Sequence, residues 1–158
     1  MKLLFILICL SLSNSAVSQG YINLTKKKAL EKLETIRANN KGVNIVISET
    51  DTTLLYLVRD STMKSLDFIL LFDQSGKCYK ETNKLSCDSC YQILLSNVLS
   101  DKYYRWTKID SNTYFARFPY RLILTTKLDQ AFSFEIRRSE LSGKEYRKTV
   151  KNAKSIDE

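Results

Sequence analysis

The sequence predicts an α+β fold, a curved antiparallel sheet with helices packed on one face. Two segments carry apolar residues at three- and four-residue spacing, which is typical of amphipathic helices. Each of these segments is followed by four short strand-like segments separated by polar turns, and strands joined by short turns pair antiparallel. This order suggests a tandem α-β4 arrangement followed by a C-terminal helix.

The first predicted unit begins with a helix over residues 24–39, in which Ala29, Leu33 and Ile36 share one face. Asn23 or Thr25 is expected to cap its start. Gly76 suits a turn position with positive φ between the last two strands of the unit. The four strands are expected at residues 43–48, 54–59, 66–72 and 77–80.

The second predicted unit begins with a helix over residues 87–99, for which Ser86 is the expected N-cap. Ser142 and Glu145 have the spacing of a capping box, in which each side chain satisfies a backbone N–H at a helix start. A basic helix is therefore expected after Ser142. The four strands between the two helices are expected at residues 103–109, 113–118, 120–126 and 131–137.

The first eighteen residues have the pattern of a cleavable signal peptide. Lys2 precedes an apolar run at residues 3–12, and small residues Ala16 and Ser18 suit the −3 and −1 positions of a cleavage site. The run is shorter than the roughly 20 residues that cross a bilayer. We expect cleavage after Ser18, with a cut after Ala16 as the alternative, and a secreted or periplasmic protein without a transmembrane span.

Residues 19–158 are expected to form one α+β domain. Hydrophobic residues make up 44% of the 158-residue chain, which has four glycines and one proline, so the composition is that of a folded domain without a linker. The α-β4 element order resembles that of cystatin-like domains, and its tandem form resembles secreted β-lactamase-inhibitor-type proteins. This resemblance of layout implies a binding or inhibitor-like role.

Cys78, Cys87 and Cys90 remain after removal of the predicted signal peptide, an odd number for an exported protein. The preferred interpretation is a structural disulfide from Cys78 to Cys87 or Cys90. A Cys87–Cys90 bridge, which would leave Cys78 free, is the alternative. A third hypothesis makes Cys87 and Cys90 a redox-active pair at a helix N-terminus, where the helix dipole lowers a thiol pKa.

The chain contains no histidine, which removes the commonest general base and the Ser-His and Cys-His nucleophile pairs. A three-cysteine zinc site would also lack its fourth ligand. No phosphate-binding glycine loop or nucleic-acid motif is present. We therefore expect no cofactor, metal or nucleic-acid partner and favour a non-enzymatic function, although a redox activity stays open through the cysteine pair.

The formal net charge of +8 favours an acidic protein or an anionic envelope component as the partner. Aromatic residues are abundant in the second half, and Tyr, Trp and Arg are favoured anchors at interfaces. The sequence therefore predicts an exported binding or inhibitor-like domain of unknown partner, with a thiol-disulfide redox protein as the alternative. Its predicted interface comprises Tyr104, Trp106, Tyr114, Arg117 and Tyr120.

Overall fold

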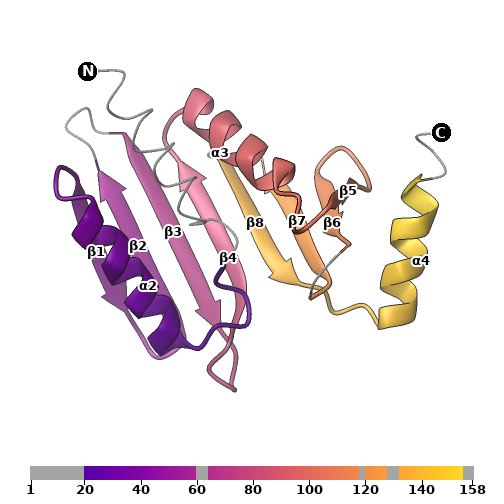
Figure 1. The fold of residues 1–158 in the computed structure, drawn as a ribbon, viewed down its shortest axis with the longest axis horizontal. Coiled ribbons are helices and arrows are strands. Elements are labelled where there is room, and N and C mark those ends of the chain that lie inside the picture. The colour runs from indigo at the N-terminus through magenta and orange to yellow at the C-terminus, as the bar shows by residue number, and fades with distance from the viewer. Residues whose placement is uncertain (1–19, 60–63, 118–119, 128–131, 155–158) are drawn as a thin grey trace.

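The computed structural model describes residues 20–59, 64–117, 120–127 and 132–154. The predicted signal peptide at residues 1–18 lies outside them. The described chain forms one open, antiparallel eight-stranded sheet and three helices (Figure 1), so the predicted α+β class is confirmed. None of these three helices is long and apolar enough to cross a bilayer.

The helix-plus-four-strands order occurs twice along the chain, followed by the third helix. The helices are α2 (Lys26–Asn39), α3 (Asp88–Ser100) and α4 (Gly143–Lys154). The strands of the first half are β1 (Asn44–Glu49), β2 (Thr53–Arg59), β3 (Ser65–Phe72) and β4 (Cys78–Leu85). Those of the second half are β5 (Trp106–Lys108), β6 (Thr113–Ala116), β7 (Leu122–Lys127) and β8 (Phe132–Arg138).

The two groups of four strands meet in the middle of the sheet. The spatial order is β1-β2-β3-β4-β8-β7-β6-β5, so each half is a meander whose last strand pairs with the last strand of the other half. The central β4–β8 pair runs in register from Lys80 opposite Arg137 to Leu85 opposite Phe132. Arg138, at the end of β8, also forms an ion pair with Asp73 in the β3–β4 turn.

Helices α2 and α3 cover the same face of the sheet (Figure 1). Strands β2 and β3 alternate half-buried and buried residues, as expected for strands with one covered face. Beside α2, the Tyr21 ring packs 5.1 Å from the ring of Phe68 on β3. Tyr91 of α3 contacts Phe132 and Phe134 of β8. We call this side of the sheet the covered face and the other side the outer face.

Helix α4 packs against the outer face instead. Phe115 pairs with Ile123 across β6 and β7, and both form a small core with Tyr146 of α4. Their neighbours Tyr114 and Leu124 belong to the main core under α3. Because successive strand residues point to opposite faces, the α4 core lies on the side away from α3.

Two predicted strand boundaries were wrong. The strand predicted at residues 77–80 continues to Leu85, because Glu81, Asn83 and Leu85 alternate toward the covered face although two of them are polar. The strand predicted at residues 103–109 is limited to Trp106–Lys108, since Arg105 has a φ of 48°, outside the β region. The remaining described strands and helices occupy the predicted segments within a few residues at each end.

The predicted turn and cap residues gave mixed results. Thr25 caps α2, Gly76 has a φ of 71°, and the Ser142–Glu145 capping box forms with N–H···O distances of 2.9 and 3.3 Å. Ser86 is not the N-cap of α3, because its hydroxyl accepts a hydrogen bond from the Ser65 N–H. Cys87 takes the cap position, and its sulfur accepts from the Cys90 N–H.

Candidate functional site

The structure does not bring the five predicted interface residues together on one exposed surface. Tyr104 is 7% exposed, and its ring stacks on the Trp106 ring with 5.8 Å between the centroids. Tyr104, Trp106 and Tyr114 all pack into the main core. Tyr120, in contrast, is 57% exposed. Arg117 is exposed, and its Nε donates to the Thr107 hydroxyl at 3.0 Å. Three of the four predicted aromatic residues therefore pack in the core, and Arg117 lies at a different site.

Arg117 lines two pockets beside β5 and α4. The first has a volume of about 460 Å³ and is lined by Lys102, Tyr103, Arg105 and Arg117. The second has a volume of about 310 Å³ and is lined by Arg117, Tyr146, Arg147, Val150 and Lys151. Because they share Arg117, the two pockets adjoin, and we refer to them together as the Arg117 site.

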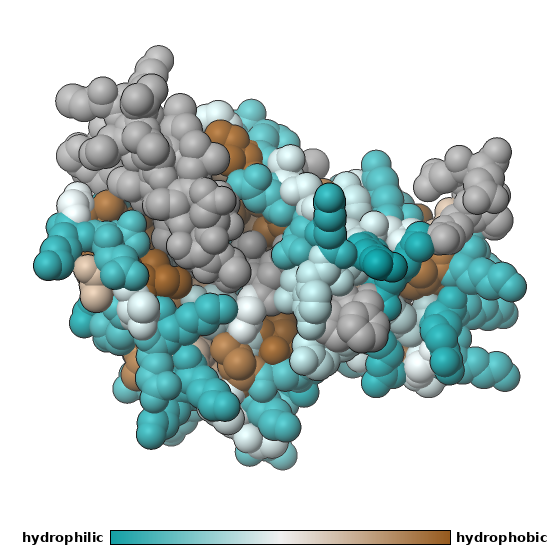
Figure 2. All heavy atoms as spheres, viewed as in Figure 1, coloured by the Kyte–Doolittle hydropathy of each residue, from teal (hydrophilic) through white to brown (hydrophobic). Residues whose placement is uncertain are grey.

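The described residues that line the Arg117 site carry positive charge and no carboxylate. Asp101, next to Lys102 in the chain, accepts a hydrogen bond from the Tyr103 N–H at 2.8 Å. Three of the four described residues lining the larger pocket are cationic, and no described aspartate or glutamate lines either pocket. Within the described ranges, no ion pair engages the cations of either pocket. Figure 2 shows that hydrophilic residues dominate the visible surface of α4, at the right of the view. Such a concentration of one charge attracts anions.

The backbone around the Arg117 site is held in uncommon conformations. Arg105, Tyr120 and Arg121 have φ values of 48°, 68° and 51°, a region that non-glycine residues occupy rarely. The Arg117 N–H donates to the Tyr104 carbonyl at 3.0 Å and also lies within hydrogen-bonding distance of the Arg105 carbonyl. Such strained conformations persist only where the surrounding structure holds them in place, and they cluster at functional sites.

Tyr146 fixes the α4 wall of the site. Its hydroxyl lies 2.7 Å from the Ala116 carbonyl and 2.6 Å from that of Leu122, and its ring stacks on Phe115 at 4.8 Å. Burial raises the pKa of Tyr146, so the hydroxyl stays protonated and donates to this pair of carbonyls. Arg121 also donates to the Leu141 carbonyl at 2.8 Å, just before α4 begins.

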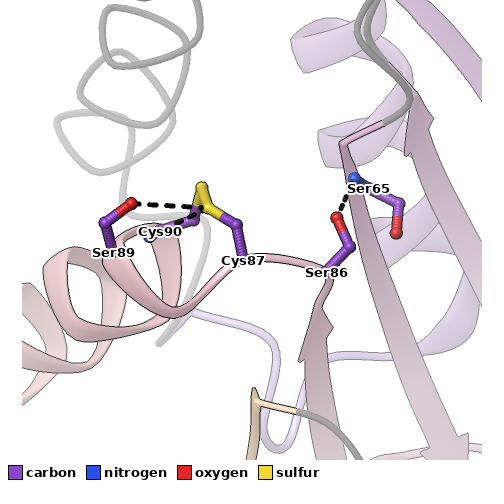
Figure 3. Close-up of a disulfide and its surroundings, with 5 residues drawn as sticks. All are labelled: Ser65, Ser86, Cys87, Ser89 and Cys90. Atoms are coloured by element: carbon purple, nitrogen blue, oxygen red, sulfur yellow. Dashed lines mark hydrogen bonds between the residues drawn. A yellow bond between two sulfur atoms is a disulfide. The ribbon is translucent and has the colours of Figure 1, made fainter.

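The cysteines pair differently from the preferred prediction. Cys87 and Cys90 form a disulfide at the N-terminus of α3 (Figure 3), with a Cα–Cα distance of 5.4 Å, and Cys78 is a buried free thiol. Cys78 begins β4 whereas Cys87 follows its end, so the two cysteines are separated by the length of the strand, about 25 Å at 3.3 Å per residue. A Cys78 disulfide was therefore wrong because β4 is longer than predicted.

The neighbourhood of the disulfide is built from hydroxyl groups. The Ser89 hydroxyl lies 3.6 Å from the Cys87 sulfur, and Ser86 and Ser65 tie the end of β4 to the start of β3 (Figure 3). Cys87 is half-buried and Cys90 is buried. The more accessible sulfur is therefore that of Cys87, at the cap position of the helix.

A buried polar cluster lies on the covered face and was missed by the sequence analysis. It comprises Tyr21, Tyr56, Glu81 and Asn83, each at most 1% exposed. The two tyrosine hydroxyls, both Glu81 carboxyl oxygens and Asn83 Nδ2 have no hydrogen-bond partner in the described part of the chain. Buried polar groups without partners are rare in folded proteins.

The electrostatics of this cluster centre on Glu81. Burial raises the pKa of Glu81 well above its ordinary value, and the Lys32 ammonium partly opposes that shift. Lys32 lies 4.7 Å over the Tyr21 ring, and burial lowers its pKa. Burial also raises the pKa of Tyr56 to about 12 and that of Cys78 to about 12. Burial therefore favours the uncharged form of each of these groups.

In the described ranges, no group of three or more Cys, Asp or Glu residues has the arrangement of a metal site. Comparison of the chain with protein families, with curated proteins and with solved structures finds no match. The functional argument therefore depends on the chemistry of the Arg117 site and of the Cys87–Cys90 pair.

Proposed function

We propose that this protein is an exported, non-enzymatic binding module that recognises anionic lipid headgroups of a cell envelope through the Arg117 site. The observation that carries the proposal is the larger pocket, whose described lining brings together Lys102, Arg105 and Arg117 and contains no carboxylate. Guanidinium groups bind phosphate and carboxylate oxygens in a bidentate manner, and ammonium groups add charge.

The lining of the second pocket favours an amphiphilic ligand over a purely ionic one. Tyr146 and Val150 supply an apolar floor, while Arg147 and Lys151 stand exposed at its rim. A phosphate headgroup in the larger pocket would thus have an apolar surface beside it. Tyr103 is 56% exposed at the same site, and tyrosine favours the interface between water and lipid.

The basic residues of α4 extend the cationic surface beyond the two pockets. Lys144, Arg147, Lys148 and Lys151 are exposed or half-buried on a helix with one acidic residue, Glu145, and the Glu145 carboxylate is used in the capping box. Each basic residue near an anionic membrane contributes about 1 kcal/mol to binding. The combined surface is therefore sufficient for reversible attachment.

Co-sedimentation with vesicles tests this proposal. We expect the protein to sediment with vesicles of phosphatidylglycerol and phosphatidylcholine and to stay in solution with phosphatidylcholine alone. The triple variant Lys102→Gln, Arg105→Gln, Arg117→Gln should bind on the order of 100-fold more weakly, because three contacts of about 1 kcal/mol each are lost.

The matched control removes the same charge elsewhere. Lys27, Lys28 and Lys41 are exposed at α2 and just beyond it, and their triple change to glutamine should leave most of the binding intact. An equal loss in both triple variants would mean that net charge alone drives attachment. That result, or equal binding to both vesicle types, would contradict recognition by the Arg117 site.

A thiol-disulfide redox protein is the second candidate, favoured by the Cys87–Cys90 disulfide at the start of α3. If the disulfide is structural, Cys87→Ser with Cys90→Ser should cost about 2 kcal/mol of unfolding free energy, as a four-residue loop closure predicts. Urea unfolding of the oxidised protein and of the double variant measures this cost. Vesicle binding should persist in the double variant.

Reduction of insulin disulfides by dithiothreitol separates the two candidates. A redox protein accelerates this reaction, and the double serine variant abolishes the acceleration. We expect no acceleration by the unmodified protein. A rate that depends on Cys87 and Cys90 would replace the binding proposal by the redox one.

A further inference from the structure

The two edges of the sheet differ in how well they are protected. Strand β5 has three residues and lies against α4. At the other edge, β1 has six residues and pairs with β2 without a bulge (Figure 1). Proteins usually guard an edge strand with proline, lysine, a bulge or a covering element, because its free N–H and C=O groups can pair with another strand. The β1 sequence, NIVISE, contains neither proline nor lysine.

The side chains of β1 place at least one apolar residue on each face of this edge. Ile45 and Ile47 pair with Val58 and Tyr56 and therefore point toward the covered face. Val46 points to the outer face and is 48% exposed. On that face it adjoins the half-buried Leu57 of β2, its direct partner in the sheet. Among the described strands this edge has no further partner, and a free edge with apolar side chains favours strand addition.

The order of residues in β1 suits a second copy of itself. If two β1 strands pair antiparallel about a twofold axis at Val46, Val46 faces Val46 of the other copy and Ile45 faces Ile47. Asn44 then faces Ser48. From Asn44 to Ser48, every pair in this register matches apolar with apolar or polar with polar on the same face of the joined sheet, and Glu49, the last residue of β1, faces Val43 just outside the strand. A symmetric interface requires this kind of self-complementarity.

We propose that the protein forms a twofold-symmetric dimer through antiparallel pairing of β1 with β1 of a second copy, centred on Val46. The two sheets then become one continuous sixteen-stranded sheet, twice the eight strands of one chain. The charge near β1 does not oppose the pairing, since the Glu49 carboxylate lies 3.2 Å from the Lys26 ammonium. The contact is small, so the dimer is of the weak class.

Cysteine cross-linking tests both the dimer and its register. Directly opposed residues of antiparallel strands have Cβ atoms about 4.5–5.5 Å apart, close to the geometry of a disulfide. Val46→Cys should therefore form a covalent dimer under mild oxidation, seen on a non-reducing gel. Ser48→Cys should stay monomeric, because in this register the two Ser48 positions lie about 13 Å apart along the strands.

Both substituted positions are exposed on the same face of the same strand, so the comparison controls for accessibility. Cross-linking of neither variant, of both equally, or of Ser48→Cys alone would overturn the proposal. As a second measurement, sedimentation equilibrium should give a concentration-dependent dimer for the unmodified protein. Val46→Lys, which places two ammonium groups opposite each other, should shift it to monomer at all concentrations, and an unchanged dimer would also overturn the proposal.

Discussion

Replacing Tyr146 by alanine should lower the free energy of unfolding by about 3–5 kcal/mol, the cost typical of truncating a large buried aromatic side chain. Tyr146 is 3% exposed and forms the centre of the small core on the outer face. Its removal takes away both the stacking on Phe115 and the hydrogen bond to the Ala116 and Leu122 carbonyls. Urea unfolding measures the change.

Tyr146→Phe separates the two contributions. This variant keeps the ring and loses the hydroxyl, so its cost should be about 1–2 kcal/mol, the cost of a lost buried hydrogen bond. Because α4 forms one wall of the Arg117 site, we expect Tyr146→Ala to weaken vesicle binding as well. A Tyr146→Ala protein as stable as the original would show that α4 does not depend on this anchor.

The second large effect concerns Glu81. Its folded pKa is raised by burial, so the stability it contributes is fully present below the unfolded pKa, about 4.3 for glutamate. That stability is lost as the pH rises toward the folded pKa. The glutamine of the Glu81→Gln variant cannot ionise. The free energy of unfolding of this variant should therefore equal that of the original protein in acid and exceed it at alkaline pH by on the order of 3 kcal/mol.

Urea unfolding of both proteins across acidic to alkaline pH measures the difference. Among the described residues, Lys32, Tyr21, Tyr104 and Cys78 interact electrostatically with Glu81, and the cationic form of Lys32 favours the carboxylate. Lys32→Met should therefore keep the pH dependence and move it to higher pH. A constant difference between the original protein and Glu81→Gln at every pH would mean that Glu81 does not titrate in this range.

The order of helices and strands was predictable from sequence, because the spacing of apolar residues and the residue types of turns and caps depend only on neighbours in the chain. Apolar spacing located α2 and α3, and the Ser142–Glu145 box located the start of α4. The pairing of β4 with β8 was not predictable in the same way. It joins residues that are 47 to 57 positions apart in the chain, and no local pattern encodes that contact.

The candidate sites were harder to predict, and the reasons differ. Glu81 and Asn83 are polar at positions that a covered strand fills with apolar residues, so the alternation of β4 was hidden and the strand was ended too early. That error also led to the preferred Cys78 disulfide. Arg117 was among the predicted residues, but its partners Lys102 and Arg105 lie in a turn whose geometry depends on a positive φ.

The central position of β4 has a consequence for how the chain is assembled. Because the chain is synthesised in order from its N-terminus, β1 to β4 can pair with their neighbours before β8 has emerged, and β4 is then a temporary edge. Lys80, Glu81, Asn83 and Lys84 place charge and polarity along that edge. Such residues discourage intermolecular strand pairing during folding. We therefore expect the polar composition of β4, unfavourable in the finished core, to discourage aggregation of the half-made protein until β8 pairs with it.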